Sequence, residues 1–264
     1  MTEPVVLVEQ RDHTLLVTIN RPRAANSINA AVHQGLGEAW ERADSDKNIR
    51  TVVLTGAGDS VFCGGADLKA LGTAGPDGVT PPETAHWGFA GVVKHHIRKP
   101  VIAAVNGTAL GGGTELALAS DLVVASDSAE FGLPEVHRGL IAGAGGVFRI
   151  GQAIPRAVAM ELILTGKPMS APDALRWGLV NRVVPQTDVL STALALAEDV
   201  AAGAPLAVQA SKIVAQGIVD GKVAAEEQAW ALTDEALGRL TTSADTLEGV
   251  MAFMQKRAPV WKGE

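Results

Sequence analysis

The sequence is short of several residue types, and each shortage excludes a class of protein. Cys63 is the only cysteine, so no internal disulfide can form, which fits a reducing cytoplasm. Lysine and arginine together are fewer than aspartate and glutamate. The formal net charge of −7 argues against a general affinity for nucleic acid or for an anionic membrane surface. Charged residues make up only 19% against 47% hydrophobic residues, which excludes a disordered chain and predicts a packed core.

Targeting and membrane segments are also missing from the pattern. The N-terminus has no basic region followed by an apolar one, as a secretory signal would. The most apolar long window, residues 101–125, contains Glu115 and Asp121 together with four glycines. We therefore expect no membrane span and a cytoplasmic protein.

Common motifs for metals and nucleotides are absent. The chain contains neither G-x-S-x-G nor H-E-x-x-H. The glycines between 107 and 113 do not fit G-x-G-x-x-G, and the calcium-loop-like stretch at 44–48 is followed by Ile49 where the loop needs glycine. We expect neither a metal nor a dinucleotide cofactor.

What is present is an alternation of strand and helix patterns, which is typical of an α/β core. Apolar residues three and four positions apart predict a helix over 29–44, and a stretch rich in Gly, Pro and Thr predicts a loop at 72–82, the best candidate for a mobile lid. Residues 205–264 carry long helical patterns with almost no strand signal. The other predicted elements are strands at 5–10, 13–20, 51–56, 101–106 and 121–126, a glycine-rich turn into a helix at 56–71, a helix ending within 92–100, and a helix at 111–120.

Two glycine-rich turns, CGGADL at 63–68 and LGGGTEL at 110–116, enter predicted helices. The first N–H groups of a helix have no partner within the helix and lie at its positive dipole end. Glycine lets an oxygen approach such amides closely. A pair of these turns can therefore form an oxyanion hole.

These residues resemble the enoyl-CoA hydratase/isomerase superfamily, the crotonases. The similar stretches are NRPRAANSIN, SVFCGGADL, KPVIAAVNGTALGGGTELALASD, FGLPE with GLIAGAGG, and AFMQKR, and they follow one another along nearly the whole chain. The resemblance implies a spiral of ββα units over residues 1–204 and a helical C-terminal oligomerisation region over 205–264. It also implies a homotrimer or a dimer of trimers.

The same resemblance implies an acyl-CoA site. The amides of Ala66 and Gly112 would hold the thioester oxygen, and Glu115 and Glu135 would be catalytic, Glu115 mainly toward water and Glu135 mainly in proton transfer at carbon. Taken alone, Glu115 reads as a helix-capping residue and Glu135 as a solvated loop carboxylate. Together they suit the addition of water to an enoyl thioester, because one carboxyl accepts a proton and the other donates one.

For the CoA moiety, the resemblance implies Arg23 and Lys256 as contacts; their alternatives are a surface arginine and a solvated cation at a helix end. Cofactors other than the substrate's own CoA are not expected. The full set of predicted binding residues is Arg23, Ala24, Asp67, Leu68, Lys69 and Lys256.

The preferred activity is enoyl-CoA hydratase. Another crotonase reaction, isomerisation or dehydration of a specialised hydroxyacyl-CoA, is the alternative, and a non-catalytic acyl-CoA binder is a third. Leu133, His137 and Arg138 differ from the residues common in hydratases, which leaves the acyl group of the substrate open.

Overall fold

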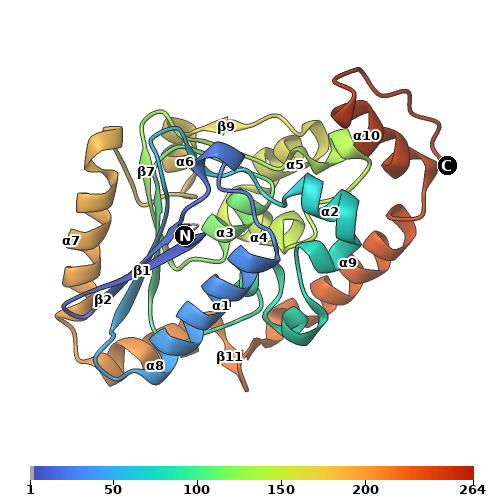
Figure 1. The fold of residues 1–264 in the computed structure, drawn as a ribbon. Coiled ribbons are helices and arrows are strands. Elements are labelled where there is room, and N and C mark those ends of the chain that lie inside the picture. Colours follow the sequence, from blue (N-terminus) through green and yellow to red (C-terminus); the bar gives the residue numbers. More distant parts are fainter. Residues whose placement is uncertain (1–2) are drawn as a thin grey trace.

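The computed structural model describes residues 3–264 and begins with a hairpin (Figure 1). Strand β1 (Val6–Arg11) pairs antiparallel with β2 (Thr14–Ile19), and the turn between them places Asp12 at a φ of 48°. Both predicted strands are confirmed.

The main sheet has six strands in the order β1-β2-β3-β5-β7-β10, parallel from β2 onward. Alternate side chains of its central strands enter two separate apolar clusters. One cluster packs against α7 (Val189–Ala201), and the other faces α1 (Ala30–Ser45) and the rest of the core. Burial of both faces explains why these strands read as continuous apolar runs. The other strands of the main sheet are β3 (Thr51–Gly56), β5 (Val101–Val105), β7 (Leu122–Ser126) and β10 (Arg182–Val184).

A second sheet makes the fold a spiral. Its strands are β4 (Val61–Cys63), β6 (Thr108–Leu110), β8 (Glu130–Gly132) and β9 (Met169–Ser170), in that order. The chain passes from the first sheet to the second three times, from β3 to β4, from β5 to β6 and from β7 to β8. Each passage leads into a helical segment, namely α2 (Leu68–Ala74), α3 (Gly112–Leu118) or the 3-10 helix η5 (Pro134–Arg138). The predicted α/β spiral of ββα units is thereby confirmed.

Two local predictions need correction. No helix ends within 92–100; the chain instead forms turns after the short 3-10 helices η3 (Pro82–Trp87) and η4 (Phe89–Gly91). Positive φ angles at Gly88, Ala90 and Gly91 interrupt any helix there. The predicted loop at 72–82 includes the end of α2 and the 3-10 helix η2 (Gly75–Gly78).

The C-terminal residues are mainly helical, as predicted, and α9 and α10 lie on the side of the molecule away from α7 (Figure 1). A two-stranded hairpin, β11 (Ile218–Val219) and β12 (Lys222–Val223), was not predicted. The division at residue 204 stays a prediction. The helices are α8 (Pro205–Gln216), η7 (Ala224–Glu226), α9 (Glu227–Leu240) and α10 (Ala244–Met254).

The connection between the spiral and this region is also helical. It consists of α4 (Gly146–Ala153), α5 (Arg156–Thr165), α6 (Ala171–Trp177) and η6 (Gln186–Asp188). Within residues 3–264 no single helix is long and apolar enough to span a membrane; the segments Gln186–Ala201 and Pro205–Gln216 reach that length and apolarity only as a pair bent by 104°. The same residues contain no group of three or more His, Cys, Asp or Glu side chains able to hold a metal ion.

Candidate active site

The two glycine-rich turns lie against each other. A Cβ atom placed on Gly65 would come within 3.1 Å of the Gly112 nitrogen, and one placed on Gly113 would collide with the Cys63 carbonyl oxygen. Gly111 has a φ of 54° and a ψ of −121°, a conformation that residues with a side chain avoid. Close packing against the first turn therefore explains Gly113 and contributes at Gly112, and the backbone conformation explains Gly111.

The amides of Ala66 and Gly112 come from these two turns. Ala66 forms an isolated parallel bridge with Ile28, and Gly112 is the first residue of α3. Within residues 3–264, neither amide is the donor of a hydrogen bond to a protein acceptor. Both are thus available to an oxygen of a bound molecule.

Glu115 is in the first turn of α3 and is only 3% exposed. Its Oε1 accepts a hydrogen bond from the Gly146 amide at 2.9 Å, at the start of α4. Burial, followed by the neighbouring charge of Glu135, raises the pKa of the Glu115 carboxyl to about 8. This side chain is more than a solvated capping residue.

Glu135 reaches the same place from η5. A Cβ atom on Gly111 would lie 2.6 Å from its Oε1, so the carboxyl rests over that glycine. Its Oε2 is buried without a hydrogen-bond partner, and burial raises the pKa of the carboxyl to about 7. The interpretation of Glu135 as a solvated carboxylate is therefore wrong.

Two coupled carboxyls with raised pKa values share protons. Burial disfavours the charged form of each carboxyl, and the charge of one carboxylate disfavours ionisation of the other. Near neutral pH the pair Glu115 and Glu135 therefore carries about one proton between them, a state that belongs to the pair rather than to either residue. The arrangement can accept one proton and donate another.

Each part of this site follows a strand of the second sheet. Ala66 is the third residue after β4, Gly112 the second after β6, and Glu135 the third after β8. Because β4, β6 and β8 are parallel, their carboxyl ends meet at one edge. The site is assembled at that edge.

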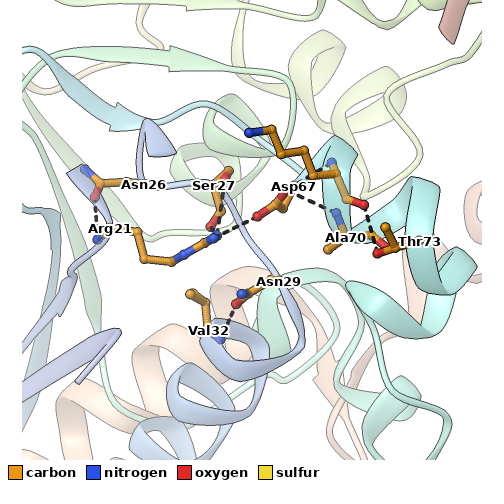
Figure 2. Close-up of polar contacts among 9 residues, drawn as sticks. Arg21, Asn26, Ser27, Asn29, Val32, Asp67, Ala70 and Thr73 are labelled. Carbon is orange, nitrogen blue, oxygen red and sulfur yellow. Dashed lines mark hydrogen bonds and ion pairs between the residues drawn. The ribbon is translucent and has the colours of Figure 1, made fainter. Parts of the chain in front are cut away.

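Asp67 has a structural role that its sequence motif did not reveal. Its carboxylate forms an ion pair with Arg21 at 2.8 Å and caps α2 by accepting from the Lys69 and Ala70 amides at 3.1 and 3.2 Å (Figure 2). Arg21 also donates to the Ser27 carbonyl at 2.6 Å. The carboxylate of Asp67 is thus occupied by protein groups, and its amide donates to the Ile28 carbonyl at 2.8 Å.

Two residues of this network were missed by sequence reasoning. Arg21 lies 46 positions from Asp67, beyond the reach of any local pattern. Asn26, with a φ of 50°, accepts from the Arg21 amide and donates to the carbonyls of Ala57 and Val61. Its position in a polar loop does not indicate from sequence that Asn26 joins these three segments by hydrogen bonds.

The other predicted CoA contacts lie at the surface or near it. Arg23 is exposed and Ala24 partly buried in the 3-10 helix η1 (Pro22–Ala24); the next carbonyl, of Ala25, accepts from the Gly64 amide at 2.9 Å, which joins this loop to the first glycine turn. Leu68 and Lys69 begin α2. Lys256 is exposed beyond α10 with a φ of 54°, and its amide donates to the Phe253 carbonyl at 3.1 Å.

Further side chains pack around the turns. Burial raises the pKa of the Cys63 thiol to about 12, so the thiol stays protonated near neutral pH and is a poor nucleophile. The rings of His95 and Trp87 stack with their centres 5.2 Å apart. Phe89, not predicted at all, presses on Gly112, where a Cβ atom would collide with its ring.

The spiral fold with paired glycine turns and two coupled carboxyls defines an acid–base enzyme of the crotonase fold. The sequence model of the family described as "Enoyl-CoA hydratase/isomerase" matches residues 9–264, and the chain belongs to this family.

Relatives narrow the reaction class. The "Carnitinyl-CoA dehydratase" of Proteus mirabilis (strain HI4320) is 41% identical over 259 residues, which cover 96% of each chain. A crystal structure of carnitinyl-CoA hydratase from Mycobacterium avium is 57% identical with a TM-score of 0.97 over 100% of both chains. The enoyl-CoA hydratase of Mycobacterium tuberculosis H37Rv is 44% identical with a TM-score of 0.76, covering 99% of this chain and 100% of that one. The protein is a CoA-thioester hydratase or dehydratase, a hydro-lyase.

Proposed function

We propose that the protein interconverts a trans-2-enoyl-CoA and the corresponding 3-hydroxyacyl-CoA with Glu115 and Glu135 as its catalytic acids and bases. The observation that carries this proposal is the coupled carboxyl pair beside Gly111 and Gly112. A hydration needs both proton transfers, whereas isomerisation can proceed with one carboxyl and mere binding with none.

The amides of Ala66 and Gly112 would hold the thioester oxygen as it gains negative charge. In hydration, the water oxygen bonds to C3 while Glu115 accepts a proton from the water. Glu135 delivers a proton to C2, which restores the neutral thioester. Dehydration reverses each transfer, so that Glu135 removes the C2 proton and Glu115 protonates the departing hydroxyl.

CoA binding would use Arg23 and Lys256 for charged contacts, and main-chain groups of residues 66–69 for the adenine and pantetheine. Arg23 supports this assignment because its loop is joined to the first glycine turn. Both cations are exposed, which leaves them free to bind phosphate. We propose no further cofactor.

A second, more specific candidate function is the dehydration of carnitinyl-CoA, or the reverse hydration. Relatives at 41% and 57% identity carry that substrate in their names, and such identity over nearly whole chains favours a common substrate type. Carnitine has a trimethylammonium group, so the acyl end would be cationic. Buried Leu133 and partly buried Arg138 lie on either side of Glu135 in the sequence, at positions whose residues differ from those common in hydratases.

The test compares matched thioesters. The enoyl-CoA obtained by dehydrating carnitinyl-CoA is compared with crotonyl-CoA and with the neutral isostere in which carbon replaces the quaternary nitrogen. Higher kcat/KM for the cationic compound than for its isostere would establish the carnitinyl substrate; preference for the neutral compounds would leave the general hydratase.

The roles of the glutamates are tested on whichever thioester is turned over. Glu115→Gln and Glu135→Gln should each lower kcat by at least ~10²-fold, the low end of general acid–base contributions, while acyl-CoA binding is retained. Full activity in both variants would remove the pair from the mechanism.

The proposed assembly is a homotrimer or a dimer of trimers, with residues 205–264 at the interfaces. Exposed apolar side chains on its helices, Leu206, Val214 and Leu247 among them, support this proposal. A cytoplasmic location is likewise proposed and is supported by the single cysteine.

A further inference from the structure

A buried ionic cluster connects the C-terminal region to the core. Arg149 on α4 forms a bidentate pair with Glu226 on η7, Nε to Oε1 at 2.8 Å and Nη2 to Oε2 at 2.7 Å. The two side chains are 6% and 8% exposed. Trp230 on α9 donates its Nε1–H to the same carboxylate at 3.2 Å. A charge pair this deeply buried is costly to desolvate, which points to a role other than stability.

The cluster lies behind the turn that holds Glu115. A Cβ atom on Gly145 would be 3.2 Å from Cη2 of Trp230 and 3.3 Å from Nη1 of Arg149. Gly145, with a φ of 101°, is the N-cap of α4, and the next amide, of Gly146, donates to Glu115. Any shift of the cluster would therefore move the amide that fixes the Glu115 carboxyl.

The cluster also touches the segment that carries Phe89. Nη2 of Arg149 donates to the Val93 carbonyl at 2.9 Å, and the third guanidinium nitrogen, Nη1, is buried with no hydrogen-bond partner. Arg149 thus joins three parts of the chain: the C-terminal region, the turn before α4, and the segment that presses on Gly112.

We propose that Glu226 and Trp230 are positioning residues that act through Arg149 to fix the Gly145–Gly146 turn and, through it, the Glu115 carboxyl. The inference rests on the proposed function of Glu115. It gives the C-terminal region a part in catalysis in addition to assembly.

The charges around the cluster support an electrostatic part of this role. The charges of Glu135 and Arg149 both act on Glu115, and the positive charge of Arg149 favours its ionised form. Glu226 neutralises Arg149. Lys94 lies 4.2 Å from the Trp230 ring centre, and burial, followed by the charge of Arg149, lowers the pKa of His96 to about 4, so His96 is uncharged near neutrality.

Glu226→Gln removes the charge while keeping the size of the side chain. We expect kcat to fall on the order of 10-fold with KM nearly unchanged, because a misplacement of about 1 Å can cost up to ~10²-fold. The kcat/KM profile as a whole should move to lower pH, because the uncompensated Arg149 favours ionised Glu115. Glu227→Gln, an exposed neighbour with the same change of charge, is the control and should leave both unchanged.

Trp230→Phe provides a second test if the Gln variant does not fold. It removes the Nε1–H donor and the ring atom over Gly145, and it should lower kcat several-fold without a matching rise in KM. Folded Glu226→Gln or Trp230→Phe enzyme with wild-type kcat and pH profile would overturn the inference. If Glu115→Gln is inactive in the same assays, the proposed function stands; if it is fully active, the proposed function fails instead.

Discussion

At the scale of single residues, Glu115 and Glu135 show how burial prepares a functional group at a cost to folding. Each carboxyl is held where its charged form is disfavoured. A protein selected for stability alone would carry an amide or apolar residue at such positions. Two predictions follow from this conflict between proton transfer and stability.

The first concerns activity and pH. The proposed mechanism requires one protonated and one ionised carboxyl, so the profile of kcat/KM should be bell-shaped with its maximum between about pH 7 and 8. Below this range both groups are protonated and the base is lost; above it both are ionised and the acid is lost. Initial rates from about pH 5 to pH 10 measure this profile. A profile that lacks the acidic or the alkaline limb would contradict the proposal that the two carboxyls act as a pair.

The second concerns stability. Folding raises the pKa of Glu115. The stabilisation of the folded state by its protonated carboxyl is therefore fully present below the ordinary pKa of 4.5 and is lost as the pH rises through about 8. Relative to Glu115→Gln, the wild type should lose unfolding free energy by at most ~1.4 kcal/mol per pH unit over that interval. Thermal melts at several pH values measure the difference.

The control for this experiment is Glu161→Gln, an exposed residue of α5. Its melting temperature should follow the wild type at every pH. Curves for the wild type and Glu115→Gln that stay parallel between pH 5 and 8 would show that the carboxyl is not buried as the structure has it.

At the scale of elements, α10 holds the segment that carries Glu135. Thr246 donates to the Gly139 carbonyl at 2.7 Å, and Gly249 packs so tightly on η5 that a Cβ atom there would lie 2.5 Å from the Arg138 carbonyl carbon. Arg138 in turn lies 4.1 Å from the ring centre of Phe253. The position of Glu135 therefore depends on the docking of this helix.

We expect Gly249→Ala to push α10 away from η5 and to lower kcat on the order of 10-fold, the consequence of a small misplacement of a catalytic group. Gly238→Ala in α9 is the matched control, since no atom lies within 4 Å of its Cβ position. It should leave activity unchanged and stabilise the helix by up to about 1 kcal/mol. Equal kinetics for both variants would show that α10 does not position Glu135.

Elements with a local pattern were predictable from sequence, and elements set by distant contacts were not. Helix α1 follows from its apolar spacing and its Asn29 cap. The segment after Gly88 contains apolar residues that suit a helix, yet Gly91 packs on the backbone of Gly37 in α1 and takes a positive φ. That contact joins residues far apart in the sequence, so no local period could reveal it.

The same distinction applies to the site. Glu115, Glu135 and the glycine turns lie in motifs that resemble a family and could be named from sequence. The pair of Arg149 and Glu226 is separated by 77 positions, and neither residue stands in a motif. Only the folded arrangement brings them behind Glu115.

At the scale of the whole molecule, the apolar surface of α10 predicts contact with another copy. Leu247, Met251 and Met254 are spaced along one face and are 64%, 43% and 69% exposed. Burial of such a patch between subunits is worth roughly 25 cal/mol for each Å² removed from water. Covering it would complete the proposed trimer.

Replacing Leu247 and Met254 with Glu together should therefore shift the protein toward monomers in sedimentation velocity at micromolar concentration. Leu164→Glu, on α5 outside the C-terminal region and 67% exposed in the single chain, should leave assembly intact. Dissociation by Leu164→Glu alone, with the double variant still assembled, would place the interface elsewhere.

The assembly of the site at one edge of the second sheet makes the fold modular. Successive turns of the spiral contribute Ala66, Gly112 and Glu135, each from the segment after its own strand. A chain built this way can exchange the residue delivered by one turn while the other two keep their backbone geometry. The turns proposed to hold the thioester oxygen are thus a part separate from the proposed acid supplied after β8, and under this proposal new chemistry on a thioester can arise by altering a single turn.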